Sequence, residues 1–85
     1  MPSKPTPLQI LGQQIREMRK SMSLTQEELA HESNIDRSYI GGVERGGERN
    51  LKFTMLCKIA RALRCDVASL TQWLRTGLGY GNGWA

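Results

Sequence analysis

The chain has 85 residues, a formal net charge of +4 and 39% hydrophobic residues, which fits one small folded domain and excludes an intrinsically disordered chain. No apolar run approaches the ~20 residues that a membrane span needs, and the first residues lack the apolar core of a signal peptide, so we expect a cytoplasmic protein without a membrane partner. Cys57 and Cys65 stand apart from any zinc-binding spacing, and we expect buried thiols and no bound metal.

The N-terminal segment is predicted to be a flexible arm, because residues 1–7 contain three prolines. We expect the folded domain to cover residues 8–75, followed by a glycine-rich tail at residues 76–85. The domain opens with apolar residues at three- and four-residue spacing, which predicts a first helix: Leu8, Leu11, Ile15 and Met18.

The second predicted helix opens with a capping box. The Thr25 hydroxyl can accept from the Glu28 amide, and the Glu28 carboxylate can reach back to the Thr25 amide. Leu29 and Ala30 are predicted to face inward. Asn34 tolerates the left-handed conformation that ends a helix, so we expect a sharp turn there.

The third predicted helix begins after Asp36, a good N-cap residue, and directs Ile40 and Val43 to the core. Gly46 and Gly47 end it. Two helices joined by so short a turn can cross at a fixed angle, which leaves the start of the second one free to enter a DNA major groove.

Two further helices are predicted, which makes the fold class all-α. The fourth carries an apolar stripe of Phe53, Leu56, Ala60 and Leu63, although Lys52 occupies the position where a capping residue is expected. The fifth begins after Asp66 and carries Val67, Leu70, Trp73 and Leu74.

Several short motifs occur together in a fixed order: Arg19, Thr25–Ala30, Tyr39–Ile40, Val43–Gly46 and Ile59–Leu63. With these motifs the chain resembles the phage-repressor and Cro-type (XRE) helix-turn-helix family over about residues 8–74. The resemblance implies a five-helix, lambda-repressor-like domain. It also implies a transcription regulator that binds a specific double-stranded DNA sequence.

Within that family, residues 36–40 and 49–51 are most similar to the controller proteins of restriction–modification systems. This narrower resemblance implies a small homodimer that acts on a palindromic operator and controls a restriction–modification operon. The chain departs from the family pattern at Gly41 and Gly42, because a side chain often reads bases at the position of Gly42.

Candidate DNA contacts follow from chemistry and from the resemblance. Arg37 can form a bidentate contact with a guanine edge, and Ser38 and Tyr39 are the other expected base readers, although Tyr39 could instead pack against the second helix. The resemblance implies phosphate contacts from Gln26, Arg45, Arg49, Asn50 and Lys52. Arg45 and Arg49 could also be ordinary solvated charges.

Two further sets of residues are expected to act structurally. The resemblance places Arg19 and Glu44 as an orienting ion pair between the first and third helices. Leu70, Trp73 and Leu74 give the last helix more apolar surface than the core needs, so we expect them to form the homodimer interface.

The sequence favours no enzyme, because it shows no nucleophile–base pair, no glycine-rich phosphate loop and no metal cluster. No cofactor or small-molecule ligand is expected. The alternative that stays open is an antitoxin or protein-interaction module, for which apolar residues near the C-terminus would supply the surface: Trp73, Leu74, Leu78 and Tyr80. A neighbouring toxin gene would support that alternative, and neighbouring restriction and methyltransferase genes would support a controller.

Overall fold

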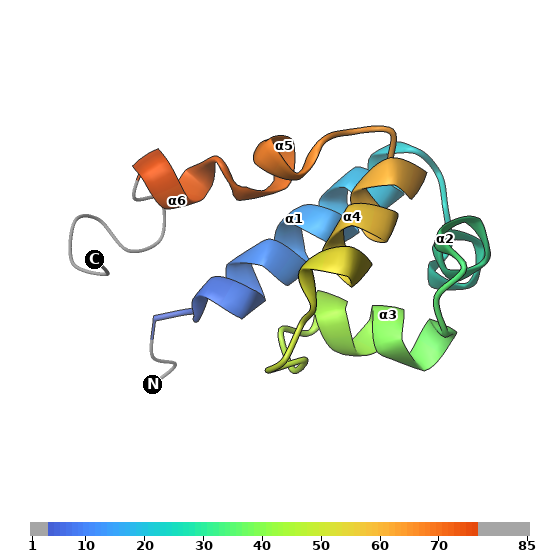
Figure 1. Cartoon of the computed structure of the whole chain (residues 1–85), viewed down its shortest axis with the longest axis horizontal. Coiled ribbons are helices and arrows are strands. Elements are labelled where there is room, and N and C mark those ends of the chain that lie inside the picture. The colour runs from blue at the N-terminus through green and yellow to red at the C-terminus, as the bar shows by residue number, and fades with distance from the viewer. Residues whose placement is uncertain (1–3, 77–85) are drawn as a thin grey trace.

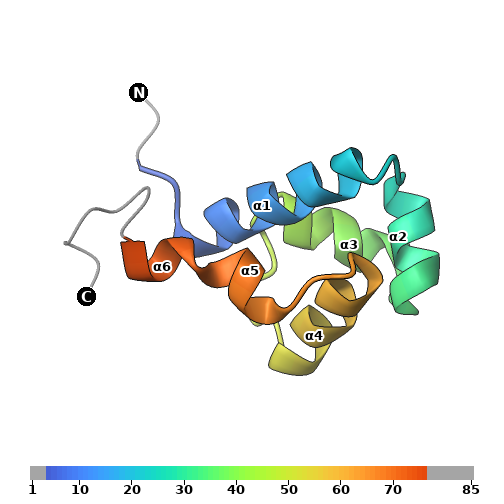
Figure 2. The same ribbon diagram turned by 90° about the horizontal axis from the view of Figure 1, so that it is seen from above.

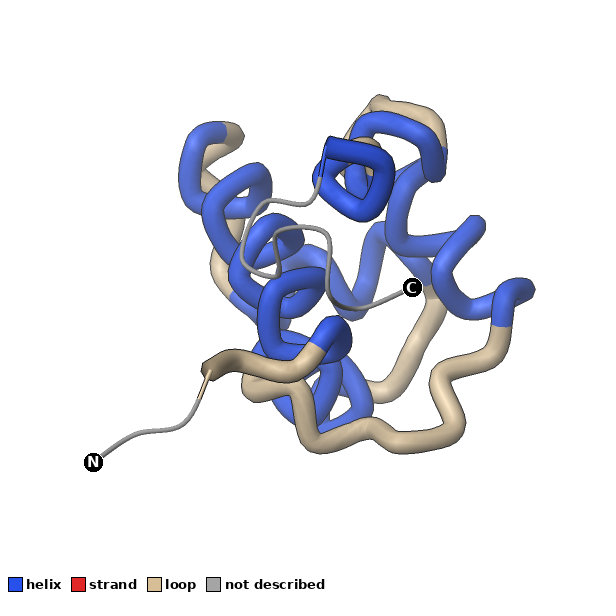
Figure 3. Tube along the Cα trace, turned by 90° about the vertical axis from the view of Figure 1, so that its left-hand side faces the viewer, coloured by secondary structure: helices blue, strands red, loops and turns tan. Residues whose placement is uncertain are grey.

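The computed structural model describes residues 4–76, with side chains through residue 74, and the regular structure in that range is entirely helical (Figures 1 and 3). The helices follow in chain order as α1 Pro7–Ser21, α2 Gln26–Ser33, α3 Arg37–Glu44, α4 Phe53–Ala62, α5 Val67–Thr71 and α6 Trp73–Thr76. The predicted all-α class is confirmed, with the expected fifth helix divided at Gln72 into α5 and α6. None of these helices is long and apolar enough to cross a membrane.

The first helix begins earlier than the predicted domain boundary. Thr6 is its N-cap: the Thr6 hydroxyl accepts from the Gln9 amide at 3.1 Å, and the Thr6 amide donates to Gln9 Oε1 at 2.9 Å. Pro7 therefore starts a helix instead of ending an arm, which suits a residue whose missing N–H would have no helical partner there. Residues 1–3 lie outside the described range.

The turn between α2 and α3 has the geometry that its residues predict. The capping box forms, with the Thr25 amide 2.8 Å from Glu28 Oε1 and the Glu28 amide 3.0 Å from the Thr25 hydroxyl. Asn34 adopts the left-handed conformation at φ 56°. Asp36 then caps α3 by accepting from the Ser38 amide at 3.0 Å. These local contacts fix where α2 ends and α3 begins.

One core joins the helices. Each of α1 to α5 supplies one of the five largest fully buried side chains, which are Ile15, Leu29, Ile40, Ile59 and Leu70. α1 packs against both α3 and α5, which lie below and above it in Figure 1, and α2 packs against α3 and α4. Seen from above, α2 closes one end of the bundle and α6 lies at the other end (Figure 2).

Two glycines permit close approaches around α1. A Cβ at Gly12 would lie 2.3 Å from the backbone oxygen of Val43, so α1 and α3 could not cross this closely with any larger residue. Gly46 follows α3 with φ +73°, and a Cβ there would lie 2.5 Å from the Cα of Gln9. The chain therefore turns out of α3 directly against the start of α1.

Two predictions about side-chain placement near α4 are wrong. Phe53 is 67% exposed, because it is the first residue of α4 and precedes the turn that packs on the core, so the apolar stripe begins at Leu56. Cys57 and Cys65 are half-buried free thiols and not buried ones. Burial raises the pKa of the Cys65 thiol, and the neighbouring Asp66 carboxylate raises it further.

The expected apolar dimer surface is also corrected. Leu70 is 0% exposed and Trp73 is 4% exposed, so both belong to the core of their own chain. The indole N–H of Trp73 donates to the Leu70 carbonyl oxygen at 2.7 Å, which turns the ring back over α5. Leu74 is half-buried, and Leu78 and Tyr80 lie outside the described residues.

Candidate nucleic-acid interface

The third helix lies at an edge of the molecule, together with the loop that leads to α4 (lower side of Figure 1). Its two faces differ: Ile40 and Val43 are buried, whereas Arg37 and Ser38 in the first turn are exposed. Tyr39 is half-buried and packs against the core, so part of its ring is engaged in packing. The first turn of α3 thus presents Arg37 to solvent with its guanidinium available to a nucleic-acid edge.

The inner end of α3 is tied to α1 by Arg19 and Glu44. Arg19 Nε lies 2.6 Å from Glu44 Oε2 and Arg19 Nη2 lies 3.0 Å from Glu44 Oε1, a bidentate pair. Arg19 Nη1 also donates to the Leu24 carbonyl oxygen at 2.7 Å. The two side chains are only 9% and 3% exposed, and the hydrogen bond to Glu44 raises the pKa of the Arg19 guanidinium. The pair therefore locks the angle between α1 and α3 and touches no outer surface.

Gln26, an expected phosphate contact, takes part in the same network. Its Nε2 donates to Glu44 Oε1 at 3.1 Å, so its amide donor is directed inward. Glu27 and Glu28 follow it in the first turn of α2. Their negative charges stabilise the helix, because they lie at the positive end of its dipole, but they would repel a phosphate. The geometry makes Gln26 a residue that positions α2 against α3. A phosphate at this point could still accept from the backbone N–H of Gln26 or from the second N–H of its amide group.

Ser38 is involved in capping α3. Its hydroxyl donates to the Asp36 carboxylate, and this bond, with the bond from the Ser38 amide, lowers the pKa of Asp36. The Ser38 oxygen can still accept a hydrogen bond. Ser38 is thus equipped to meet an amino group on a base rather than a base acceptor.

The loop after α3 presents cations beside an uncapped helix end. Arg49, Asn50 and Lys52 are exposed, while Leu51 is half-buried against the core and holds the loop in place. Lys52 is the N-cap of α4 and makes no side-chain cap hydrogen bond. The first amides of α4 and the cations of the loop therefore form one positive surface, of the kind that binds phosphate.

Arg45, another expected phosphate contact, lies apart from the cationic loop that follows α3. It is the C-cap of α3, and its guanidinium reaches back over the helix, so that a Cβ at Gly41 would lie 3.2 Å from Arg45 Nη1. The carboxylate of Glu48 lies over Gly42 in the same way, with Oε1 3.2 Å from the position of a Cβ. This placement was not predicted from the sequence, although glycines three and four positions before an arginine on a helix were the available signal.

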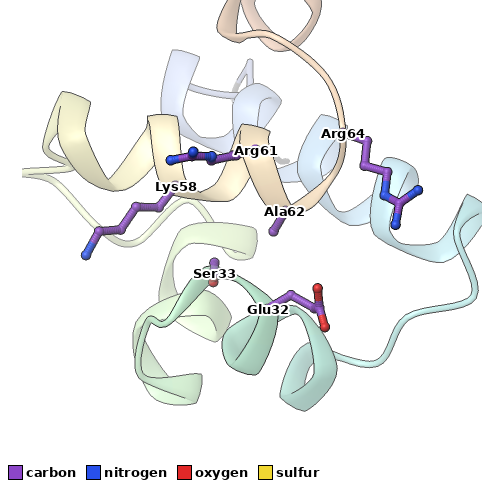
Figure 4. Close-up of a pocket in the computed structure, with 6 residues that line it drawn as sticks. All are labelled: Glu32, Ser33, Lys58, Arg61, Ala62 and Arg64. Carbon is purple, nitrogen blue, oxygen red and sulfur yellow. The ribbon is translucent and has the colours of Figure 1, made fainter.

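A pocket between α2 and α4 is also lined by several charged residues (Figure 4). Its lining residues are Glu32, Ser33, Lys58, Arg61, Ala62 and Arg64. The Ser33 hydroxyl donates back to the Leu29 carbonyl oxygen at 2.7 Å. Lys58, Arg61 and Arg64 point in different directions in Figure 4, so their charges do not converge on one ligand position. The surface formed by α3 and its following loop is therefore the better candidate site.

Comparisons with known proteins agree with this geometry. A family described as helix-turn-helix matches residues 15–70. The control protein C.SmaI of Serratia marcescens is 42% identical over 62 residues, covering 73% of each chain. The crystal structure of the restriction–modification controller protein C.AhdI of Aeromonas hydrophila superposes with a TM-score of 0.71 at 46% identity, covering 74% of this chain and 94% of that one.

A second similar structure contains a nucleic acid. SinR, a master regulator for biofilm formation solved in complex with DNA, superposes with a TM-score of 0.67 at 30% identity, covering 71% of this chain and 95% of its own. The all-helical arrangement, the α2–turn–α3 unit and these likenesses lead to one assignment. The chain belongs to the helix-turn-helix family of DNA-binding transcription regulators, in the group that contains the restriction–modification control proteins.

Proposed function

We propose that this protein binds a specific palindromic site on double-stranded DNA as a homodimer and controls the transcription of restriction–modification genes in the cytoplasm. The observation that carries the proposal is the exposed Arg37 at the start of α3, beside the exposed cationic loop of Arg49 and Lys52. The likeness to C.SmaI and C.AhdI supports the choice of target genes.

Two parts of the surface bind DNA in different ways: the first turn of α3 contacts bases, and the loop before α4 contacts phosphates. Arg37 reads a guanine edge, with Ser38 and the exposed part of Tyr39 beside it in the major groove. Arg49, Asn50 and Lys52, with the amides that begin α4, hold phosphates and set the depth of α3 in the groove.

The test begins with the selection of duplexes bound by the full chain from random DNA. Arg37→Ala should then weaken the selected site by roughly 1–3 kcal/mol and relax the preference at one base pair in each half-site. Arg49→Ala should weaken selected and scrambled duplexes alike and flatten the salt dependence by about one unit of slope. An equal loss on both duplexes for Arg37→Ala would show that Arg37 contacts phosphate instead.

A separate experiment tests whether the protein binds DNA as a homodimer. Two copies related by a two-fold axis place their α3 helices about 34–36 Å apart, one turn of DNA. We expect sedimentation to show a dimer on the selected duplex, and selected sites to contain inverted half-sites at that spacing. A monomer at high micromolar concentration, both with and without DNA, would exclude this arrangement.

A further inference from the structure

One face of α3 has no side chains at Gly41 and Gly42, and both glycines are buried beneath side chains from neighbouring positions, among them Arg45 and Glu48. Ser38, Gly41, Gly42 and Arg45 are three, four and seven positions apart, so they share a face. Ile40 and Val43 on the opposite side are buried. Between Ser38 and Arg45 the face therefore bears no side chain of its own.

Arg45 covers this face from the end of the helix. Long helical side chains lean toward the N-terminus and cover the preceding turn. Arg45 does so here: Nη1 lies 3.2 Å from the position of a Cβ on Gly41, and Nη2 lies 4.0 Å from that on Gly42. Its guanidinium thus lies over the middle of α3, where a side chain at residue 41 or 42 would otherwise stand.

We infer that Arg45 is a base-reading residue, which recognises guanine in the major groove through the space left by Gly41 and Gly42. This inference rests on the proposed function, since it requires α3 to lie in the groove. Arg37 in the first turn and Arg45 over the second would then read two different base pairs of each half-site. A guanidinium on this face can donate two parallel hydrogen bonds to O6 and N7 of guanine.

The neighbouring carboxylate favours a base edge over a phosphate as the partner of Arg45. Glu48 Oε1 lies 3.2 Å from the position of a Cβ on Gly42, on the same face as the guanidinium. A phosphate placed here would meet this negative charge. A base edge would not, because the amino group of cytosine or adenine can donate to a carboxylate.

The first experiment compares two replacements of Arg45 in the full chain, on the selected duplex and on variants of it at each base pair. Arg45→Ala should reduce the preference at one base pair per half-site by roughly five- to 150-fold, at a position different from that of Arg37→Ala. Arg45→Lys keeps the charge but lacks the planar fork, so it should lose the same preference while retaining most of its affinity for scrambled DNA.

The second experiment uses the glycines. Gly41→Ala introduces a methyl group that would meet the movable end of Arg45 at 3.2 Å and Gln26 Oε1 at an ordinary 3.6 Å, so helix propensity should raise Tm by roughly 2–8 °C. It should also reduce the preference at the Arg45 base pair, and it should have no further effect on that preference in the Arg45→Ala background. Gly47→Ala is the matched control, because its Cβ would meet only the Gly42 oxygen at an ordinary 3.7 Å.

The outcomes separate this inference from the proposed function. If Arg45→Ala weakens all duplexes equally and Arg45→Lys restores the affinity, Arg45 contacts phosphate and the inference is overturned while sequence-specific binding stands. If the wild-type chain selects no sequence, the proposed function fails and the inference fails with it. An altered preference at one base pair in both Arg45 variants supports the inference, provided that their thermal unfolding matches wild type.

Discussion

The two faces of α3 meet their surroundings in different ways. On the inner face a Cβ at Gly12 would collide with the backbone oxygen of Val43 at 2.3 Å, and a backbone atom cannot move aside. On the outer face a Cβ at Gly41 would meet side-chain atoms, Arg45 Nη1 at 3.2 Å and Gln26 Oε1 at 3.6 Å, and the end of Arg45 can move. The inner face therefore fixes the position of the helix, and the outer face can change its chemistry without changing the fold.

The charged side chains on the two faces of α3 differ in the same way, because the Arg19–Glu44 ion pair on the inner side is buried. Glu44 joins three helices, because it accepts from Arg19 of α1 and from Gln26 of α2. Arg37 and Arg45 carry the same kind of charge as Arg19 but are exposed. Loss of a charge on the inner side should damage the fold, whereas loss of a charge on the outer side should change binding alone.

The largest effect is expected at Glu44. Glu44→Ala leaves the guanidinium of Arg19 buried without its carboxylate partner and should lower the free energy of unfolding by roughly 3–5 kcal/mol. Chemical denaturation monitored by circular dichroism measures this loss. Glu32→Ala, which removes an exposed carboxylate, is the control and should stay within about 0.5 kcal/mol of wild type. A loss for Glu44→Ala as small as that of the control would contradict the structural role given to the pair.

The next largest effect is expected at Gly12 of α1, which faces the inner side of α3. Gly12→Ala should lower the free energy of unfolding by roughly 1–3 kcal/mol, because α1 and α3 must move apart to admit the methyl group. Gly41→Ala makes the same chemical change on the outer face and should have the opposite sign. The contrast between the two faces would be lost if both variants moved the denaturation midpoint in the same direction.

The parts of this structure that were predictable from the sequence are those set by neighbouring residues. The capping box at Thr25, the left-handed turn at Asn34 and the cap at Asp36 each depend on side-chain-to-backbone contacts within a few positions. Such contacts also fix where α2 and α3 begin. The helix-turn-helix unit was therefore recognisable before its packing was known.

The parts that were not predictable depend on packing between helices. The periodicity that placed Phe53 inside cannot show that α4 packs only from its second turn. The apolar pattern that placed Leu70 and Trp73 on a dimer surface cannot show that both are buried in the core of their own chain. The position of the Arg45 guanidinium also follows from the room above two glycines, which is a property of the folded helix. The sequence divides the candidate DNA contacts into base readers and phosphate contacts, but only the structure shows that Gln26 bonds to Glu44 and that Arg45 lies over α3.

A smaller effect is expected at the start of α4, where binding and stability should change in opposite directions. Lys52→Ser supplies the missing side-chain cap and should stabilise the protein by about 1 kcal/mol. The same change removes an exposed cation from the phosphate-binding surface, so the slope of the salt dependence of DNA binding should fall by about one unit. Thermal unfolding and titrations at several salt concentrations measure the two effects. A variant that gains stability and keeps the full salt dependence would show that Lys52 does not contact phosphate.

The smallest effect is a dependence of stability on acid pH that arises at the cap of α3. The bonds from the Ser38 hydroxyl and amide hold the pKa of Asp36 below its ordinary value of 3.8. Because the folded state favours the ionised carboxylate, its contribution is complete above the ordinary pKa and is lost as the pH falls through the lowered one. Asp66 is capped by Ser69 in the same way, and its pKa is also lowered.

Replacing both caps separates this contribution from the other carboxylates of the chain. The double variant Asp36→Asn with Asp66→Asn keeps two good cap residues but removes their titration. Its Tm should therefore fall less steeply than that of wild type between pH 5 and the acid limit of folding, and the two curves should run parallel above pH 5. Differential scanning calorimetry at matched ionic strength gives both curves. Parallel curves over the whole range would show that the caps hold equally well with protonated carboxyls.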